Sequence, residues 1–375
     1  MPGLYSYLNS HPDERKPPIP YAIGSQHTAI AYDPPKELLK NFYDWYRPAV
    51  DQVEDDLRNL PPVEACLRHL PAEGRRGTSS VQIRVLEHIR VTDRRNSQVV
   101  KVQASVVGSS GMSSSDSKYR RTHGGHSSMA MAPTCLPRPT AVVTAKLYDP
   151  LYVDFDDCHP DPFNNCDAAF ALETEAYRDY LRPLYGVCVP HFYGSYTIDI
   201  PIPDDTRQCQ SSLSPDQLKK SSCRTRPVRA ILYEYIPGIA LDKAMEDNLY
   251  SQSQRKEIMR ALVTAESKMR QLDVLLDEDF YPRNVLVTSA EEGQPADIRL
   301  IDFGAAECGS RQKWEAHVPT TEPEPLSQIQ KRWFDINVEW KDPSNLRHPF
   351  LDLVDWEWDE WLRHEYASPS QQRKP

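Results

Sequence analysis

Two polar runs in the second half of the chain carry residue types that could do chemistry. The first, residues 279–284, reads Asp-Phe-Tyr-Pro-Arg-Asn and precedes the apolar triplet 285–287. The second, residues 302–304, reads Asp-Phe-Gly and follows the apolar stretch 298–301. Because each run adjoins a short strand pattern, we expect each carboxylate to lie at a strand end that faces a cleft. Carboxylates in such a place could accept a proton or hold a cation.

An Asp, an Asn five residues later and a second Asp that opens Asp-Phe-Gly form the arrangement that kinases use for phosphoryl transfer. The chain therefore resembles the protein-kinase-like superfamily, and within it the divergent kinase-like proteins of fungi that carry Asp-Phe-x-Pro-Arg-Asn. The resemblance implies that Asp279 accepts the proton of a hydroxyl acceptor, and that Asn284 and Asp302 hold Mg²⁺ against the phosphates of ATP. It also implies that Arg283 contacts the γ-phosphate and that Leu286 forms the floor under the adenine.

The first half of the chain supplies a candidate for the phosphate-binding cation. Lys146 lies near the end of the apolar strand pattern 141–148 and fits the position that pairs the α- and β-phosphates in kinases. By the same resemblance, Thr144 takes the place of the small residue beside the adenine ring. Glu173 is the preferred partner of Lys146, because an apolar pair follows it three and four residues later, as in the corresponding kinase helix. Glu175 remains the alternative partner, and either carboxylate could instead lie in water on a helix surface.

A second adenine-binding element is expected where the strand pattern 228–233 ends. It runs directly into Glu-Tyr-Ile-Pro-Gly, which resembles the kinase hinge. There the backbone groups of Glu234, Tyr235 and Ile236 would read the adenine edge, a task that needs an extended segment and no particular side chain. Tyr233 would guard the back of the pocket.

The loop at the position of the kinase phosphate-binding loop contains no glycine. Strand patterns over 82–89 and 97–107 flank residues 90–96, which read Arg-Val-Thr-Asp-Arg-Arg-Asn. Glycine lets the backbone approach the phosphates closely, and the arginines of this loop cannot restore that approach. Asp277 also stands where kinases usually have a histidine. Both departures favour the alternative hypothesis of a pseudokinase, a nucleotide-binding or scaffold protein with little or no turnover.

The resemblance implies an α+β, two-lobed protein-kinase-like fold: a small antiparallel β-sheet lobe of five strands, a helical C-terminal lobe and an N-terminal helical extension. The predicted divisions are an extension over 1–80 (an irregular arm over 1–34, then a helix over 36–60), an N-terminal lobe over 81–233 with disordered inserts at about 108–139 and 203–226, and a C-terminal lobe over 234–375. The apolar stripe of the 36–60 helix either packs on the body of the protein or binds a protein partner.

Helix signals are clearest in the second half of the chain. Ser251 and Gln254 form a capping-box pattern, which predicts a helix that continues to Leu272 and leads into the loop of Asp279. A further helix is predicted over 170–184. Six of the seven tryptophans follow residue 310, and one helix face near the C-terminus would carry Phe350, Val354, Trp358, Trp361 and Leu362.

Composition narrows the class of protein. The 375 residues carry a net charge of -10 and eight cysteines without a Cys-x-x-Cys pair. The negative charge argues against nucleic acid or an anionic membrane as a partner. The scattered cysteines are typical of reduced thiols in a cytoplasmic or nuclear protein, and no apolar run is long enough for a bilayer.

Together with the resemblance, these features give a leading hypothesis. It is a phosphotransferase that uses ATP and Mg²⁺ on a hydroxyl of a protein or a small molecule. A structural protein that works through its N-terminal helix and its Trp-rich tail is a third hypothesis, beside the pseudokinase.

Overall fold

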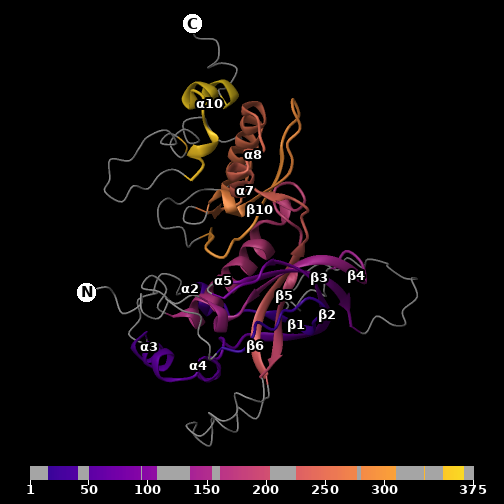
Figure 1. Ribbon diagram of the computed structural model, residues 1–375, viewed down its shortest axis with the longest axis vertical. Helices are drawn as coiled ribbons and strands as arrows, with labels where there is room; N and C mark the ends of the chain where they lie inside the picture. The colour runs from indigo at the N-terminus through magenta and orange to yellow at the C-terminus, as the bar shows by residue number, and fades with distance from the viewer. Residues whose placement is uncertain are drawn as a thin grey trace, which may run out of the picture. The chain divides into compact units, whose positions relative to one another are not determined.

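The structure, a computed structural model, divides into two compact units. The first comprises Met1–Thr174 and Phe192–Tyr235, and the second comprises Glu175–His191 and Ile236–Pro375. Figure 1 labels many of their helices and strands. The structure describes residues 16–40, 50–93, 95–107, 136–153, 161–202, 225–276, 280–309, 333 and 349–366.

The first unit is built around a closed barrel of six antiparallel strands (Figure 1). In barrel order the strands are β1 (Gln26–Asp33), β2 (Arg75–Arg90), β3 (Gln98–Val106), β4 (Thr140–Tyr148), β6 (Thr225–Glu234) and β5 (Phe192–Pro201). β1 closes the barrel, because it pairs with β2 on one side and with β5 on the other. Closure leaves neither β2 nor β5 as an open sheet edge.

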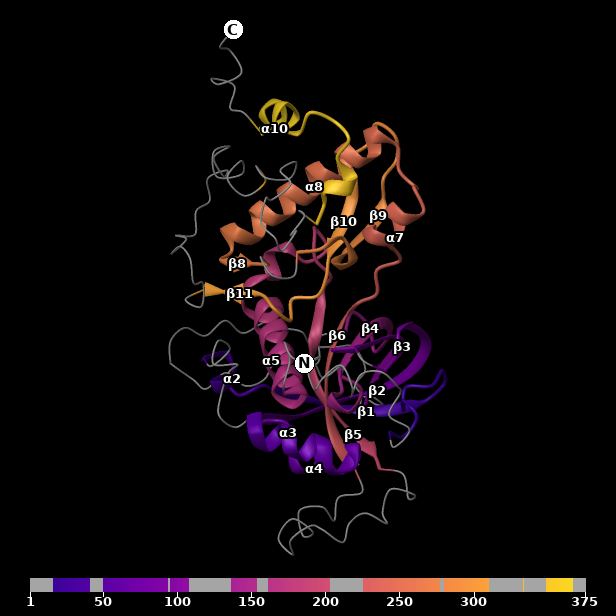
Figure 2. The ribbon, with the colours of Figure 1, turned by 60° about the vertical axis from the view of Figure 1, so that its left-hand side comes forward.

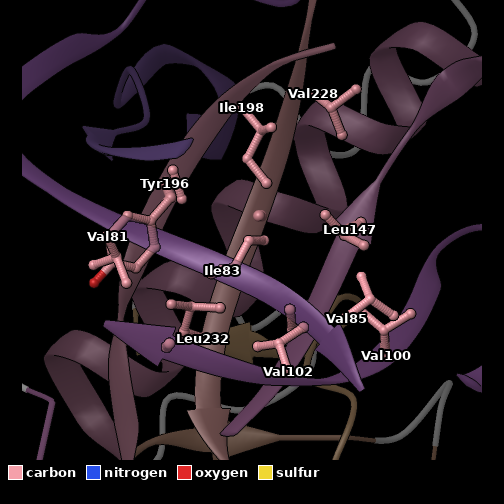
Figure 3. Close-up of a cluster of buried hydrophobic side chains, with 14 of the residues drawn as sticks. Val81, Ile83, Val85, Val100, Val102, Leu147, Tyr196, Ile198, Val228 and Leu232 are labelled. Carbon is pink, nitrogen blue, oxygen red and sulfur yellow. The ribbon is translucent and has the colours of Figure 1, made fainter. Parts of the chain in front are cut away.

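Apolar side chains fill the barrel interior, because every second residue of a strand points to the same face. Figure 3 shows this core with side chains from β2 to β6: Val81, Ile83, Val85, Val100, Val102, Leu147, Tyr196, Ile198, Val228 and Leu232. β1 adds Ala29 and Ala31 to the same cluster. Most of the labelled side chains are β-branched or aromatic, the types that strands favour.

Helix α5 (Pro162–Glu175) lies along the outside of the barrel (Figures 1 and 2). Its Phe170 ring lies 6.1 Å from the ring of Tyr32 on β1 and 5.7 Å from that of Tyr148 on β4, measured between ring centres. The first unit also contains α2 (Glu37–Lys40), α3 (Val50–Asn59), α4 (Pro62–Arg68) and the 3-10 turn η1 (Pro150–Tyr152). Val53 of α3 and Cys66 of α4 share a buried cluster with Phe163 of α5. These contacts fix α5 against the outer face of the barrel.

The segment before β1 is tied to the barrel by a buried charge cluster. Asp149, directly after β4, accepts hydrogen bonds from both terminal guanidinium nitrogens of Arg226 on β6. The hydroxyl of Tyr21 donates to the same carboxylate at 2.6 Å. All three residues are buried. Separating the partners would leave an uncompensated buried charge, which is costly. The cluster therefore holds the segment before β1 against β4 and β6.

The second unit combines one long helix with two small sheets. Figure 2 shows the long helix, α8 (Gln252–Gln271), beside β10 (Asp297–Leu300). Besides β10, the strands are β7 (Ile239–Ala240), β8 (Val274–Leu275), β9 (Val285–Ser289) and β11 (Glu307–Cys308), paired in the orders β10-β9-β7 and β11-β8. The shorter elements are the π-helix η2 (Ala176–Tyr180), α7 (Leu241–Glu246), α10 (Trp358–Tyr366) and the 3-10 turns η3 (Arg182–Leu184), η5 (Pro282–Asn284) and η8 (Leu351–Leu353). In the part of the chain that the structure describes, no helix is both long and apolar enough to cross a membrane.

The predicted fold class, a two-lobed kinase-like fold, is wrong. The sequence predicts a small sheet of five strands, whereas the first unit has a closed barrel of six. It also predicts a mainly helical C-terminal lobe, whereas the described part of the second unit has few helices and two sheets. The sixth barrel strand, β1, lies in the segment predicted to be an irregular arm. Its interior positions are alanines, which strands use rarely, so its strand signal is weak.

Two predicted helices have different bounds in the structure. The helix predicted over 170–184 is replaced by α5, which ends at Glu175, followed by η2 and η3. Pro183 lies within η3, and a proline cannot donate the hydrogen bond that a continuing α-helix needs. Near the C-terminus the helix begins at Trp358 rather than at Phe350, because the backbone at Val354 is extended. The capping box that begins α8 is present as predicted.

Several predictions fall on residues outside the described ranges. They include Asp279, Asp277, Arg94 and nearly all of the two predicted inserts. The helix predicted over 36–60 is described at α2 and α3 only, and Val53 of α3 is buried. That burial agrees with packing on the protein; a protein partner for this segment stays a prediction.

Candidate functional site

The residues predicted to bind nucleotide and metal belong to both units. Lys146, Thr144, Glu173, Tyr233, Glu234 and Tyr235 lie in the first unit, and Ile236, Arg283, Asn284, Leu286 and Asp302 lie in the second. The described chain stops at Leu276 and resumes at Phe280, so the predicted base Asp279 lies outside it.

In the first unit, Lys146 and Glu173 form a buried ion pair. Lys146 Nζ lies 2.5 Å from Glu173 Oε2, and the two side chains are 4% and 1% exposed. Lys146 points away from the barrel interior, because its strand neighbours Ala145 and Leu147 fill the core. The pairing with Glu173, rather than Glu175, is the one that the sequence favours. A cation held in this way has a fixed position, since both partners are almost fully removed from water.

Tyr148 is a third member of this buried group, and sequence reasoning missed it. Its hydroxyl donates a hydrogen bond to Glu173 Oε2, and Lys146 Nζ lies 5.4 Å from its ring centre. Tyr148 follows Lys146 by two residues, so the period of the strand places both on one face. That period is the signal that could have identified it. The glutamate thus receives a hydroxyl as well as an ammonium.

Thr144 and Tyr233 lie on the same outer face of the barrel as Lys146. They are direct cross-strand partners between β4 and β6, and both are buried. Val99 of β3 stands opposite Lys146. The face therefore carries small and aromatic side chains beside a buried ammonium.

A second lysine, Lys101, also lies on this face and was not singled out from the sequence. It stands opposite Thr144, its Nζ lies 4.1 Å from the ring centre of Tyr235, and Glu87 accepts its hydrogen bond at 3.3 Å. Hydrogen bonds with Tyr235 and Glu87 raise the pKa of this lysine. Lys101 therefore adds a second positive charge next to the segment predicted to read the adenine.

The loop between β2 and β3 is closed by its own hydrogen bonds. The Thr92 backbone N–H donates to the side-chain oxygen of Gln98 at 2.8 Å, and the Gln98 amide donates back to the Thr92 carbonyl at 2.8 Å. The Arg95 N–H donates to the carbonyl of Tyr152 at 3.1 Å. Gln98 is fully buried. The loop thus lacks glycine, and two of its backbone N–H groups already have hydrogen-bond acceptors within the protein.

Asp167 fastens α5, the helix that carries Glu173, to the segment before β2. Its carboxylate accepts a hydrogen bond from the Ala72 N–H at 2.5 Å, and the Ala72 carbonyl accepts from Arg229 and from Tyr32. Burial raises the pKa of the Asp167 carboxyl to about 6, although the Ala72 hydrogen bond and the charge of Arg229 oppose the shift. The anchor of α5 is therefore an acid that titrates close to neutral pH.

In the second unit, Asn284 and Asp302 lie at the same end of the β9–β10 hairpin. Asn284 comes directly before β9, Asp302 comes two residues after β10, and the Ile301 N–H donates to the Asn284 carbonyl at 3.0 Å. Asn284 is buried, and Asp302 is partly exposed. Asp302 has a left-handed backbone, φ +68°, which aspartate tolerates better than most residues. Pairing of the two strands thus brings together an amide and a carboxylate.

The chain around these two residues is held on both sides. Phe303 is fully buried and meets the ring of Tyr177 edge-on, with ring centres 5.0 Å apart. β11, which follows Asp-Phe-Gly, pairs with β8, which precedes the loop of Asp279. Paired strands of one unit therefore flank both predicted polar runs in the chain.

Arg283, Leu286 and Ile236 occupy separate places in the second unit. Arg283 is exposed, and its guanidinium lies 4.2 Å from the ring centre of Tyr281. Leu286 lies in the middle strand of its sheet, opposite Ala240 and Arg299. Ile236 precedes Gly238, where a Cβ atom would lie 3.0 Å from the carbonyl oxygen of Val287. Glycine there lets this segment approach β9 closely.

Asn284 and Asp302 fit a magnesium site by the chemistry of their oxygens. Mg²⁺ is usually bound by one or two protein oxygens, and its remaining ligands are water and phosphate. Among the described residues, no group of three or more His, Cys, Asp and Glu could hold a metal ion by itself. An amide oxygen and a carboxylate are ligands that Mg²⁺ takes beside water and phosphate.

No protein-family model matches this chain, and no curated protein matches it.

Proposed function

We propose that this chain is a phosphotransferase that moves the γ-phosphate of Mg·ATP to a hydroxyl of a protein or a small molecule. The observation that carries the proposal is the buried pair of Lys146 and Glu173. A buried charge pair is expensive to form and adds little to stability compared with apolar residues, so a functional reason for it is favoured. The Asn284–Asp302 arrangement gives independent support, because its two oxygens suit Mg²⁺.

Each residue has a proposed role. Lys146 binds phosphate oxygens, and Glu173 keeps its ammonium in place. Asn284 and Asp302 bind Mg²⁺, which when bound neutralises charge that develops on the phosphates. Asp279 accepts the proton of the acceptor hydroxyl. The remaining contacts to nucleotide are assigned to Arg283 at the γ-phosphate and to Thr144, Tyr233, Glu234, Tyr235, Ile236 and Leu286 around the adenine.

Transfer of radiolabel from γ-labelled ATP tests this proposal. Purified chain is incubated with Mg²⁺, labelled ATP and either a protein mixture or a set of hydroxyl metabolites. We expect label in an acceptor with the wild-type chain and none with Asp279→Asn. Lys243→Met, which changes an exposed lysine of the second unit, serves as the matched control and should transfer normally. Equal transfer by wild type and Asp279→Asn contradicts the assignment of the base.

A second candidate is nucleotide binding with little or no turnover. The closed loop between β2 and β3 favours it, because the N–H groups of Thr92 and Arg95 already have partners. Loss of one preorganised donor typically slows an enzyme by about 100- to 1000-fold. Thermal stabilisation by Mg·ATP without any transfer of label would favour this candidate, and stabilisation is expected in both cases.

We also propose a cytoplasmic or nuclear location for this activity. The four described cysteines, at positions 66, 166, 188 and 308, are buried and free. Burial raises the pKa of the Cys66 thiol to about 12, which keeps it protonated and unreactive. Reduced structural thiols of this kind are typical of compartments that do not form disulfides. Fractionation of cells followed by blotting for the chain tests the location.

A further inference from the structure

Tyr148 of β4 contacts helix α5 at two places that lie about one turn apart. Its ring meets that of Phe170 edge-on, with ring centres 5.7 Å apart, and its hydroxyl donates a hydrogen bond to the Glu173 carboxylate. Residues three apart on a helix are neighbours on its surface, so one side chain can reach both. The side chain of Tyr148 is buried. A buried side chain with these two contacts fixes where α5 lies against β4.

The strand that carries Tyr148 is itself held firmly at this end. The next residue, Asp149, accepts hydrogen bonds from both terminal guanidinium nitrogens of Arg226, and the hydroxyl of Tyr21 donates to the same carboxylate. β4 is also paired with β3 on one side and with β6 on the other. The strand therefore supplies a fixed base from which the Tyr148 hydroxyl reaches α5.

The Glu173 carboxylate receives two donors from one face of β4. Lys146 Nζ lies 2.5 Å from Glu173 Oε2, and the Tyr148 hydroxyl donates to the same oxygen. Side chains two residues apart on a strand leave the backbone about 7 Å from each other, so the two donors approach the oxygen from different directions. The carboxylate cannot turn toward one donor without weakening its bond to the other. The ammonium and the carboxylate therefore have fixed positions relative to β4.

We propose that Tyr148 is a positioning residue, whose hydroxyl holds the Glu173 carboxylate so that the Lys146 ammonium keeps the place from which it binds phosphate. The inference rests on the proposed function, in which Lys146 binds phosphate oxygens. The role of Tyr148 is indirect, because it acts through Glu173 and not on a substrate. Without the hydroxyl the carboxylate can turn, and the ammonium paired with it moves as well. A displacement of about 1 Å at reacting groups can slow a reaction by about 100-fold.

A purely structural role for the hydroxyl predicts something different. A buried hydroxyl that donates to a buried carboxylate stabilises a fold wherever it occurs. The cluster of Tyr21, Asp149 and Arg226 is a second example in the same unit, since its carboxylate also binds both a hydroxyl and a cation. If stability is all that Tyr148 provides, Tyr148→Phe should resemble Tyr21→Phe. Both would lower stability, and the folded chain would use Mg·ATP as the wild type does.

Tyr148→Phe tests the proposal, with Tyr21→Phe as the matched control. Each variant removes one buried hydroxyl and keeps its ring, and each is assayed at a temperature below its unfolding transition. In transfer of label from γ-labelled ATP, we expect Tyr148→Phe to lower kcat/KM for Mg·ATP by about 10- to 100-fold and Tyr21→Phe by less than about threefold. Equal losses in the two variants, or no loss in either, would overturn the proposal.

The NMR signal of the Lys146 ammonium provides a measurement that does not need activity. In a chain with isotopically labelled lysine, this signal is identified by its absence from Lys146→Met. We expect the ammonium protons to exchange with water faster in Tyr148→Phe than in the wild type and in Tyr21→Phe. If Tyr148→Phe does not fold, Phe170→Leu takes its place, because it removes the ring against which Tyr148 packs. If the wild type transfers no phosphate, the proposed function fails, and the exchange of these protons alone decides the positioning. Unchanged exchange in the variant overturns it.

Discussion

Replacing Lys146 by methionine should destabilise the first unit by about 3–4 kcal/mol at pH 7. The Glu173 carboxylate, 1% exposed, would then have to stay charged without its ammonium or take up a proton. Breaking a buried pair typically costs about 3–5 kcal/mol. Protonation sets a ceiling, since keeping a carboxyl of ordinary pKa, about 4.3, neutral at pH 7 costs about 3.7 kcal/mol. The Tyr148 hydroxyl still donates to this carboxylate and stabilises it, so we expect a loss nearer about 3 than about 4 kcal/mol.

The destabilisation should depend on pH in a defined direction. In the variant, burial without the ammonium disfavours the charged form of the Glu173 carboxyl. Stability is then fully retained below about pH 4 and lost as the pH rises. At pH 5 the cost of holding the carboxyl neutral is only about 1 kcal/mol. The difference between variant and wild type should therefore shrink about threefold from pH 7 to pH 5.

The free energy of unfolding of the first unit can be measured by hydrogen exchange of β4 and α5 peptides across a urea series. The double variant Lys146→Met/Glu173→Met should recover most of the loss, because apolar residues of similar size can replace a buried pair. Lys243→Met, at an exposed pair, should change stability by less than about 1 kcal/mol. A Lys146→Met chain within about 0.5 kcal/mol of the wild type at both pH values refutes this reasoning.

Three further predictions concern other sites. Asp302→Asn should abolish the Mg²⁺-dependent part of the thermal stabilisation by ATP. The variant should still fold, since asparagine also tolerates a left-handed backbone. Thermal melts of the variant with ATP, with and without EDTA, measure that part of the stabilisation. The Asp167 carboxyl, with its pKa raised to about 6 by burial, should cost the wild type about 2.4 kcal/mol as the pH rises from 4 to 7. Urea titrations across that range should show a flatter profile for Asp167→Asn. Ser251→Ala should lower the free energy of unfolding by about 1 kcal/mol, because α8 loses its capping box. Ser251→Asp should lower it much less, because aspartate also caps helices. Chemical denaturation of the two variants measures the difference.

Features set by neighbouring residues could be predicted from the sequence. The barrel strands other than β1 show alternation or continuous apolar runs, and the start of α8 follows from a serine and a glutamine three residues apart. The sequence favours Glu173 over Glu175 as the partner of Lys146, because an apolar pair follows it three and four residues later, as in the helix of the kinases that the chain resembles. The ion pair is with Glu173. Pairing of β9 with β10 likewise follows from two short apolar runs, and it places Asn284 near Asp302.

Features that depend on distant parts of the chain could not be predicted. Closure of the barrel needs β1 to meet β5, and the alanines of β1 carry no strong strand preference. The hydrogen bonds between Gln98 and Thr92 depend on burial of the Gln98 side chain. In the sequence, nothing distinguishes this glutamine from an exposed polar residue. The contact of Trp333 with Phe280 joins segments 53 residues apart, which no local period records.

The proposed function requires that Lys146, Asn284 and Asp302 bind one Mg·ATP. A crystal structure of the chain with Mg²⁺ and a non-hydrolysable ATP analogue tests it most directly. The account predicts that Lys146 Nζ lies within hydrogen-bond distance of a phosphate oxygen, with Asn284 and Asp302 oxygens on the metal. A nucleotide bound elsewhere, or phosphates held without Lys146 and Asp302, would contradict it.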